Sequence, residues 1–415
     1  MNTADPHSGR GAPIERFPRR LRQSQVDLAD WPEPDAAAQQ HSLNLIEAIR
    51  ERIVTTAGGA IPFHDYMQAA LYTPGLGYYA AGSSKFGAAG DFVTAPEISS
   101  LFAECLAEAL SPVLKSRPDW DLLEAGAGSG ILAARLLQDW QAKDCLPRHY
   151  YILELSADLR ERQRQQLEQH CPELLSRVQW LQNWPTDFNG VVLANELLDA
   201  MPVHRVHKRE GQWYEQTVGF EQDGFVSGEQ LLVNEQLQQH LAAIEQPQPL
   251  PDDYLSEINL DAAQWIESLG EQMQQGIVLL IDYGYPRHEY YHPQRQRGTL
   301  MCHYRHRAHD DPFVYPGLQD ITAHVDFTCV ADSALAAGFG VAGYTTQAHF
   351  LLDAGLMQRL EQHGGDEADY LQRAGEVKRL TLPQEMGEIF KVMLLNKGST
   401  VLPKGFSGRD LRHQL

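Results

Sequence analysis

The sequence predicts an α/β protein built around a doubly wound, mostly parallel β-sheet. A glycine-rich turn joins the short apolar segment 121–125 to residues 131–141, whose apolar positions recur at helical spacing. Further apolar segments at 150–154, 178–181 and 190–194 alternate with helical patterns, one of which predicts a helix over 157–170. These segments are apolar throughout, as expected for strands that are covered on both faces. The order and the composition together indicate a parallel sheet with helices on both sides.

The chain has 415 residues and a formal net charge of −21. This length allows one enlarged domain or two. The acidic balance argues against a general nucleic-acid-binding protein, which needs a basic surface, and it is compatible with a basic protein substrate. The five cysteines are widely spaced and form no Cys-x-x-Cys pair, so a reducing compartment is expected. No apolar run is long enough to suggest a membrane span.

Composition and periodicity divide the chain into four parts. Residues 1–40 predict a disordered tail, because Pro, Gly, Gln and charged residues dominate and little periodicity is present. Residues 41–120 predict an N-terminal helical segment that covers the site, and residues 201–275 predict an inserted subdomain. The sheet domain then consists of residues 121–200 and 276–400.

Individual elements can be predicted along these parts. In the N-terminal segment we expect helices over 42–57, 62–71 and 94–115, the last opened by a capping box at Thr94-Ala-Pro-Glu97. The later elements, in order, are a hairpin over 203–220 turning at Glu210-Gly211, a helix over 229–245, a linker at 246–251, a helix over 258–270, a strand at 277–281, a long loop over 283–330, a helix over 331–338, a strand at 340–346, helices over 348–362 and 366–378, and a closing strand at 390–395.

The turn after the first strand reads Glu124-Ala-Gly-Ala-Gly-Ser-Gly130. Gly126, Gly128 and Gly130 permit positive φ and let a ligand approach the backbone N–H groups at the start of the next helix. A dinucleotide turn, Gly-x-Gly-x-x-Gly, would have its third glycine at Ile131 instead. The observed spacing, with Glu124 two residues before the first glycine, resembles the pattern of class I S-adenosylmethionine (SAM) methyltransferases. A turn that only packs a helix on a sheet is the alternative.

Carboxylates follow the strands at the edge of the sheet where open α/β folds bind ligands. Glu154 ends the second strand, where it would accept hydrogen bonds from a ribose diol; a solvated strand-end carboxylate is the alternative. Glu196 and Asp199 follow the fourth strand three residues apart, so a helical turn capped by Asn195 would present both on one face. They indicate either a site for a cationic substrate or an ordinary helix start. Asp282 follows the next strand.

Two histidine patterns are candidates for functional sites. His303, His306 and His309 recur at three-residue intervals, but arginines lie between them and no zinc ligand pattern is matched, so no metal is expected. His324 stands two residues before Asp326 and is a candidate base, although a structural role is equally compatible with this spacing.

Seven stretches together resemble the MidA-like group of SAM-dependent methyltransferases, which includes a mitochondrial complex I assembly factor that methylates a protein arginine. They span nearly all of the chain apart from the tail. The Gly-Asp-Phe and Asn-Glu-x-x-Asp stretches are far more specific than the glycine turn. The matching stretches are 72–79, Gly90-Asp-Phe-Val-Thr-Ala-Pro-Glu97, 124–130, Asn195-Glu-Leu-Leu-Asp-Ala-Met-Pro202, 281–285, 297–300 and 320–327.

The resemblance implies a Rossmann-like, seven-stranded class I fold with SAM across the strand ends. The amino-acid part of SAM would lie over the glycine turn, its ribose at Glu154 and its adenine near Gln182 and Asn183. The expected cofactor-binding residues are Gly90, Asp91, Glu124, Gly126, Gly128, Gly130, Glu154, Gln182, Asn183 and Asn195. The candidate catalytic residues are Glu196, Asp199 and His324.

The resemblance further implies methyl transfer to an arginine of a partner protein, such as a respiratory complex I subunit or its bacterial counterpart. A catalytically silent, SAM-binding assembly factor is the alternative, and an oxidoreductase with an irregular nucleotide turn is a third reading. The chain is expected in the bacterial cytoplasm, or in the mitochondrial matrix if it is eukaryotic. The sequence leaves the oligomeric state open, with a homodimer as one option.

Overall fold

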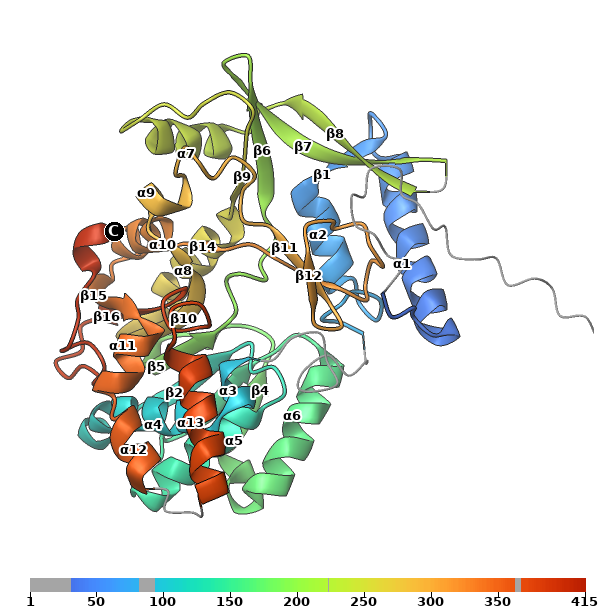
Figure 1. Cartoon of the computed structure of the whole chain (residues 1–415). Helices are drawn as coiled ribbons and strands as arrows, with labels where there is room; N and C mark the ends of the chain where they lie inside the picture. Colours follow the sequence, from blue (N-terminus) through green and yellow to red (C-terminus); the bar gives the residue numbers. More distant parts are fainter. Residues whose placement is uncertain (1–30, 82–93, 223, 363–366) are drawn as a thin grey trace, which may run out of the picture.

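An eight-stranded mixed sheet forms the centre of the computed structural model, which describes residues 31–81, 94–222, 224–362 and 367–415 (Figure 1). Its strands lie in the order β4-β3-β2-β5-β10-β16-β15, and β14 pairs with β10. Only the two pairings that involve β16 are antiparallel. The strands are β2 Asp121–Ala125, β3 Tyr150–Leu153, β4 Val178–Leu181, β5 Phe188–Asn195, β10 Met273–Tyr285, β14 Val325–Asp326, β15 Gly340–Thr346 and β16 Phe390–Lys397. The mostly parallel α/β arrangement agrees with the prediction, and β14 adds an eighth strand to the expected seven.

Helices cover both faces of this sheet (Figure 1). Leu122 and Leu123, which are adjacent in β2, enter different apolar clusters on opposite faces, and this is why the strand is buried at every position. One cluster includes residues of α4, α5, α6, α11, α12 and α13, and the other residues of α8 and α10. These helices are α4 Ser100–Ser116, α5 Ile131–Ala142, α6 Ala157–His170, α8 Leu260–Gln272, α10 Phe327–Ala336, α11 Gln347–Asp353, α12 Leu356–Gln362 and α13 Glu367–Thr381.

A second, antiparallel sheet is built mainly from the inserted segment. The predicted hairpin is confirmed, since β6 and β7 pair antiparallel and Glu210 and Gly211 between them both have positive φ. Strands β8 and β9 were not predicted; β8 occupies the start of the segment expected to be helical. The elements are β1 Ala60–Pro62, β6 His204–Arg209, β7 Gln212–Glu221, β8 Gly224–Leu231, α7 Glu235–Glu245 and β9 Tyr254–Ile258.

The N-terminal segment joins this second sheet. β1 pairs with β7, and helices α1 (Ala36–Thr55) and α2 (Phe63–Tyr72) pack against the sheet in one apolar cluster that includes Val218. Helix α1 starts inside the predicted tail, with the Asp35 side chain accepting a hydrogen bond from the Ala38 N–H. Helices α1 and α2 and strand β1 therefore share a sheet and a core with the inserted segment, whereas α4 packs against the central sheet.

The helix predicted over 94–115 is divided in two. Ser99 interrupts it between α3 (Ala95–Ile98) and α4, and the Ser99 hydroxyl caps α4 by accepting from the Leu101 N–H at 3.1 Å. Thr94 makes no side-chain capping bond, so the expected capping box does not form. Gly355, at a φ of 94°, likewise separates α11 from α12 where one helix was predicted.

The segment 283–330 is not one long loop. Its strands β11 Met301–Tyr304, β12 Arg307–His309 and β13 Asp320–Thr322 form a three-stranded sheet, and helix α9 spans Arg287–Tyr290. Strands β11 and β12 lie beside α2, and α9 lies near α10 (Figure 1). Among the residues that the model describes, no helix has both the length and the apolar character needed to cross a membrane.

Candidate functional site

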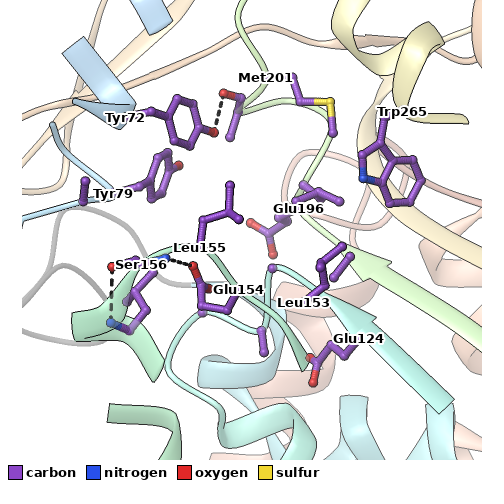
Figure 2. A pocket seen from close by; sticks show the side chains of 18 of the residues that line it. Tyr72, Tyr79, Glu124, Leu153, Glu154, Leu155, Ser156, Glu196, Met201 and Trp265 are labelled. Atoms are coloured by element: carbon purple, nitrogen blue, oxygen red, sulfur yellow. Dashed lines mark hydrogen bonds between the residues drawn. The ribbon is translucent and has the colours of Figure 1, made fainter. Parts of the chain in front are cut away.

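A cavity of about 1360 Å³ opens at the carboxyl ends of β2, β3, β4 and β5 (Figure 2). Parts of the chain that lie far apart in sequence meet there, because the carboxyl ends of parallel strands share one edge of the sheet. Residues of α8 and of the stretch 72–80 contribute further walls. The predicted site residues that line the cavity are Glu124, Gly126, Gly128, Glu154, Gln182, Asn183, Asn195 and Glu196.

The glycine turn has the expected backbone geometry. Gly126, Gly128 and Gly130 have φ values of 69°, 52° and 85°, which other residues rarely adopt. A Cβ at Gly126 would lie 2.8 Å from Cδ1 of Leu197, and one at Gly130 would lie 2.9 Å from Cα of Gln163. Gly126 and Gly128 line the cavity and Gly130 does not. The third glycine therefore serves the packing of α5 against α6.

Glu124 lies at the base of the cavity, at the end of β2 (Figure 2). Its side chain is buried and accepts a hydrogen bond from the Tyr150 hydroxyl at 2.7 Å. Burial raises the pKa of Glu124 to about 7, and the Tyr150 bond opposes this shift only in part. The carboxyl group therefore titrates close to neutral pH.

Glu154 stands immediately after β3 and is nearly fully buried. Its Oε1 accepts from the Ser156 N–H at 2.9 Å, and its Oε2 accepts from Nε2 of Gln163 at 3.2 Å. Two carboxylate oxygens offer about four acceptor positions, so capacity remains for the hydroxyl groups of a ligand in the cavity. Burial raises the pKa of Glu154, and its hydrogen bonds oppose that shift.

Glu196 projects into the cavity from an unusual backbone conformation (Figure 2). Its φ is 51°, a strained value for a residue with a side chain, of the kind that clusters at functional sites. Its N–H donates to the Ile281 carbonyl at 2.9 Å, and its Oε1 accepts from Nδ2 of Asn195 at 3.1 Å. Burial, and secondarily the charge of Asp199, raise the pKa of Glu196 to about 8.

Asp199 lies behind the cavity and does not line it. The predicted helical turn does not form, because the N–H groups of residues 197–199 converge on Oδ2 of Asp282 at 3.2, 2.9 and 3.3 Å. Burial raises the pKa of Asp199 to about 6, and the hydrogen bond from the Tyr283 hydroxyl opposes this shift. The pKa of Asp282 is raised by burial and by the negative charges of Asp199 and Glu196. The expected pair is therefore separated, with Glu196 in the cavity and Asp199 beside Asp282.

His324 is placed outside the cavity. Its ring lies against the rings of Tyr283 and Tyr285, with centroid distances of 5.0 and 5.4 Å, and burial lowers its pKa to about 4. Asp326, the expected partner, instead caps α10 by accepting from the N–H groups of Thr328 and Cys329. The pairing of His324 with Asp326 as a general base is not supported by this geometry.

Three aromatic residues of the site were not predicted from the sequence, and two predicted residues cannot be placed. Tyr72 and Tyr79 stack at 5.5 Å on the cavity wall, and Trp265 of α8 lies on the other side of Glu196 (Figure 2). The aromatic stretch 72–79 was a visible signal, whereas Trp265 looks like any aromatic residue of an amphipathic helix. Gly90 and Asp91 lie outside the described residues.

Comparisons with known proteins identify the family. A family model described as “Putative S-adenosyl-L-methionine-dependent methyltransferase” matches residues 101–345, more than half of the chain. The chain is 30% identical over 399 residues to the mitochondrial protein arginine methyltransferase NDUFAF7 homolog of Drosophila melanogaster, covering 89% of this chain and 88% of that protein. The mouse protein arginine methyltransferase NDUFAF7 is 29% identical, with 81% of each chain covered.

A solved structure extends the comparison to the cofactor. A COG1565 superfamily member from Burkholderia thailandensis, bound to S-adenosyl-homocysteine, superposes with a TM-score of 0.88 at 42% identity and covers 92% of this chain and 100% of its own. The cavity of the present chain fits such a ligand, because two positive-φ glycines allow close backbone approach and Glu154 retains acceptor capacity. SAM, when bound, supplies an electrophilic methyl group. This chain accordingly belongs to the family of SAM-dependent methyltransferases, and SAM is its cofactor.

Proposed function

We propose that this chain transfers a methyl group from SAM to an arginine side chain of a partner protein. The observation that carries the proposal is the charge of the cavity. Apart from Tyr72 and Tyr79, every ionisable side chain among its described lining residues is a carboxyl group: Glu97, Glu124, Glu154, Asp158, Glu196, Asp261 and Glu271. Such a lining favours cations and disfavours anionic acceptors.

The aromatic walls favour a guanidinium over an ammonium group. A planar guanidinium stacks on aromatic rings and forms paired hydrogen bonds with a carboxylate, whereas an ammonium group is a compact, strongly hydrated charge. Glu196 lies between the Tyr72–Tyr79 pair and Trp265 (Figure 2). In this proposal Glu196 orients the guanidinium and accepts the proton that the methylated nitrogen loses, and Asp282 holds the backbone that follows Glu196 in place through the N–H groups of residues 197–199.

The cofactor contacts are proposed as follows. Gly126 and Gly128 bind the amino-acid part of SAM, Glu154 the ribose, and Gln182 and Asn183 the adenine, since all five line one continuous cavity. The strand order β4-β3-β2-β5-β10-β16-β15 with an antiparallel β16 supports a class I methyltransferase arrangement, in which β14 is an addition.

The partner is proposed from the relatives. The relatives from Drosophila and mouse are named protein arginine methyltransferases and mitochondrial. From the resemblance to the MidA-like group we propose a respiratory complex I subunit or its bacterial counterpart as the acceptor protein, in the bacterial cytoplasm or the mitochondrial matrix. A SAM-binding assembly factor without activity is the second candidate, because the cavity alone accounts for cofactor binding.

The test combines cofactor binding and methyl transfer on the same protein. Glu196→Gln preserves shape but removes the negative charge, so SAM affinity should change less than about threefold while transfer to arginine-containing peptides falls at least about tenfold, or 1.4 kcal/mol in the transition state. Glu168→Gln, an exposed carboxyl of α6 outside the cavity, is the matched control.

The position of the methyl group decides between the candidates. Radiolabelled SAM and mass spectrometry should place the label on arginine, and peptides with lysine in place of arginine should remain unlabelled. A methyl group on lysine, on a carboxylate or on a small molecule would exclude the arginine proposal. SAM binding without any transfer would favour the assembly factor.

A further inference from the structure

The side chain of Gln163 occupies an unexpected place in helix α6. Leu159, Gln163 and Leu167 form the buried face of this helix at four-residue spacing. Gln163 is fully buried, at 0% exposure, where the pattern calls for an apolar residue. A buried amide is costly unless its polar groups are hydrogen-bonded, so its presence on this face points to a role beyond packing.

Both polar atoms of the Gln163 amide group are hydrogen-bonded, to two residues that line the cavity and to one residue of β4. Nε2 donates to the carbonyl oxygen of Gly128 at 3.1 Å and to Oε2 of Glu154 at 3.2 Å. Oε1 accepts from the indole N–H of Trp180 in β4 at 3.0 Å. One amide group thus connects the turn after β2, the end of β3 and the adjacent strand β4.

The backbone of Gln163 is also held close to the glycine turn. A Cβ on Gly130 would lie 2.9 Å from Cα of Gln163, and the glycine therefore allows α6 to approach the turn this closely. Gln163 itself does not line the cavity. Any effect of its side chain on the cofactor must consequently act through Gly128 and Glu154.

We propose that Gln163 is a positioning residue that holds the Glu154 carboxylate and the Gly128 carbonyl in one fixed relation, and so sets the affinity for SAM. This inference rests on the proposed contact between Glu154 and the ribose. A neutral amide suits the task, because it donates to the carboxylate without neutralising it. A leucine would fill the space but would remove both donors, and a glutamate would place a second carboxylate against Glu154.

Isothermal titration with S-adenosyl-homocysteine on the full chain tests the inference. Gln163→Leu should weaken binding at least about tenfold, and Gln165→Leu, the same change at an exposed position of α6, should not. In a Glu154→Ala background the Gln163→Leu change should weaken binding much less, because its main partner is already absent. Thermal melting of each variant records its folding.

A pH comparison separates positioning from a merely structural role. The affinity of Gln163→Glu for S-adenosyl-homocysteine, relative to that of the parent, should be lower at pH 8 than at pH 5.5. The reason is that two adjacent carboxyl groups share a proton only at low pH. The pH dependence of Gln163→Glu also tests the positioning role if Gln163→Leu does not fold.

Two outcomes would overturn the inference. Unchanged affinity of Gln163→Leu, or an equal loss with and without Glu154, would make Gln163 a packing residue only. Glu154→Ala that binds like the parent would instead refute the ribose contact on which the inference rests. Methyl transfer is not measured in these titrations, so a failure of the arginine proposal would leave their result standing.

Discussion

Replacing Glu196 by glutamine should stabilise the free protein increasingly as pH rises. Burial, followed by the charge of Asp199, raises the pKa of Glu196 to about 8 from its usual 4.5. The folded state therefore retains a proton that the unfolded chain releases near pH 4.5. Deprotonation of this group then costs folding free energy as the pH rises from about 4.5 to about 8. Glu196→Gln removes this titration.

The size of the effect follows from linkage. Each pKa unit corresponds to about 1.4 kcal/mol, so between pH 5 and pH 9 the parent should lose up to about 4 kcal/mol of stability that the variant keeps. The side chain borders the cavity and is partly screened by solvent, which makes about 2 kcal/mol a realistic difference. The result should be a stability difference between variant and parent that grows with pH.

Urea unfolding followed by tryptophan fluorescence at pH 5, 7 and 9 measures this difference. Glu168→Gln, at an exposed site on α6, corrects for the general effect of removing an acidic residue from a chain of net charge −21. A difference that is equal at pH 5 and pH 9 would show that Glu196 ionises normally, and it would remove the electrostatic basis for a cation site.

Two further changes test the turn and the contact between α2 and α8. Gly128, at a φ of 52°, lines the cavity, so Gly128→Val should abolish SAM binding by calorimetry while the circular dichroism spectrum remains that of the parent; unchanged affinity would contradict the site assignment. Burial lowers the pKa of His64, but hydrogen bonds to Asp261 and Asp65 outweigh burial and raise it to about 9. The resulting stabilisation is complete below about pH 6.5 and lost as pH rises through 9, so His64→Gln should destabilise the chain by on the order of 2 kcal/mol at pH 6 and little at pH 10. Equal destabilisation at both pH values would show that the charge on His64 is unimportant.

The central sheet was predictable because its strands are short, apolar and separated by clear helical patterns. The strand expected at 340–346 coincides with β15, and the helix expected over 157–170 coincides with α6. Edge strands of the inserted sheet were harder to recognise. Five of the eight residues of β8 are exposed and its end, Glu229-Gln-Leu231, is typical of a helix, so tertiary pairing with β7 decides its conformation.

The grouping of residues around one cavity was predictable where topology alone brings them together. Glu154 and the first two glycines of the turn follow neighbouring strands, and the shared carboxyl edge of the sheet places them around one cavity. The backbone of residues 196–199 depends on Asp282, which lies more than eighty residues further along the chain and accepts three of its N–H groups. Local spacing could not reveal this contact, and the helical turn predicted there is therefore wrong.

The pKa shifts suggest why this edge of the sheet is acidic at all. Burial raises the pKa values of Glu124, Glu196 and Asp199 to about 7, 8 and 6, and it also raises that of Asp282. Such groups destabilise the folded chain at neutral pH. Asp282 has a structural role, because it accepts three backbone N–H groups, but the fold gives no comparable reason to retain Glu196. A cation that enters the cavity favours the ionised forms of Glu124 and Glu196, which line it, and so lowers their pKa values. The two carboxyl groups that line the cavity are thus suited to a cationic ligand, which both the sulfonium of SAM and an arginine acceptor would supply.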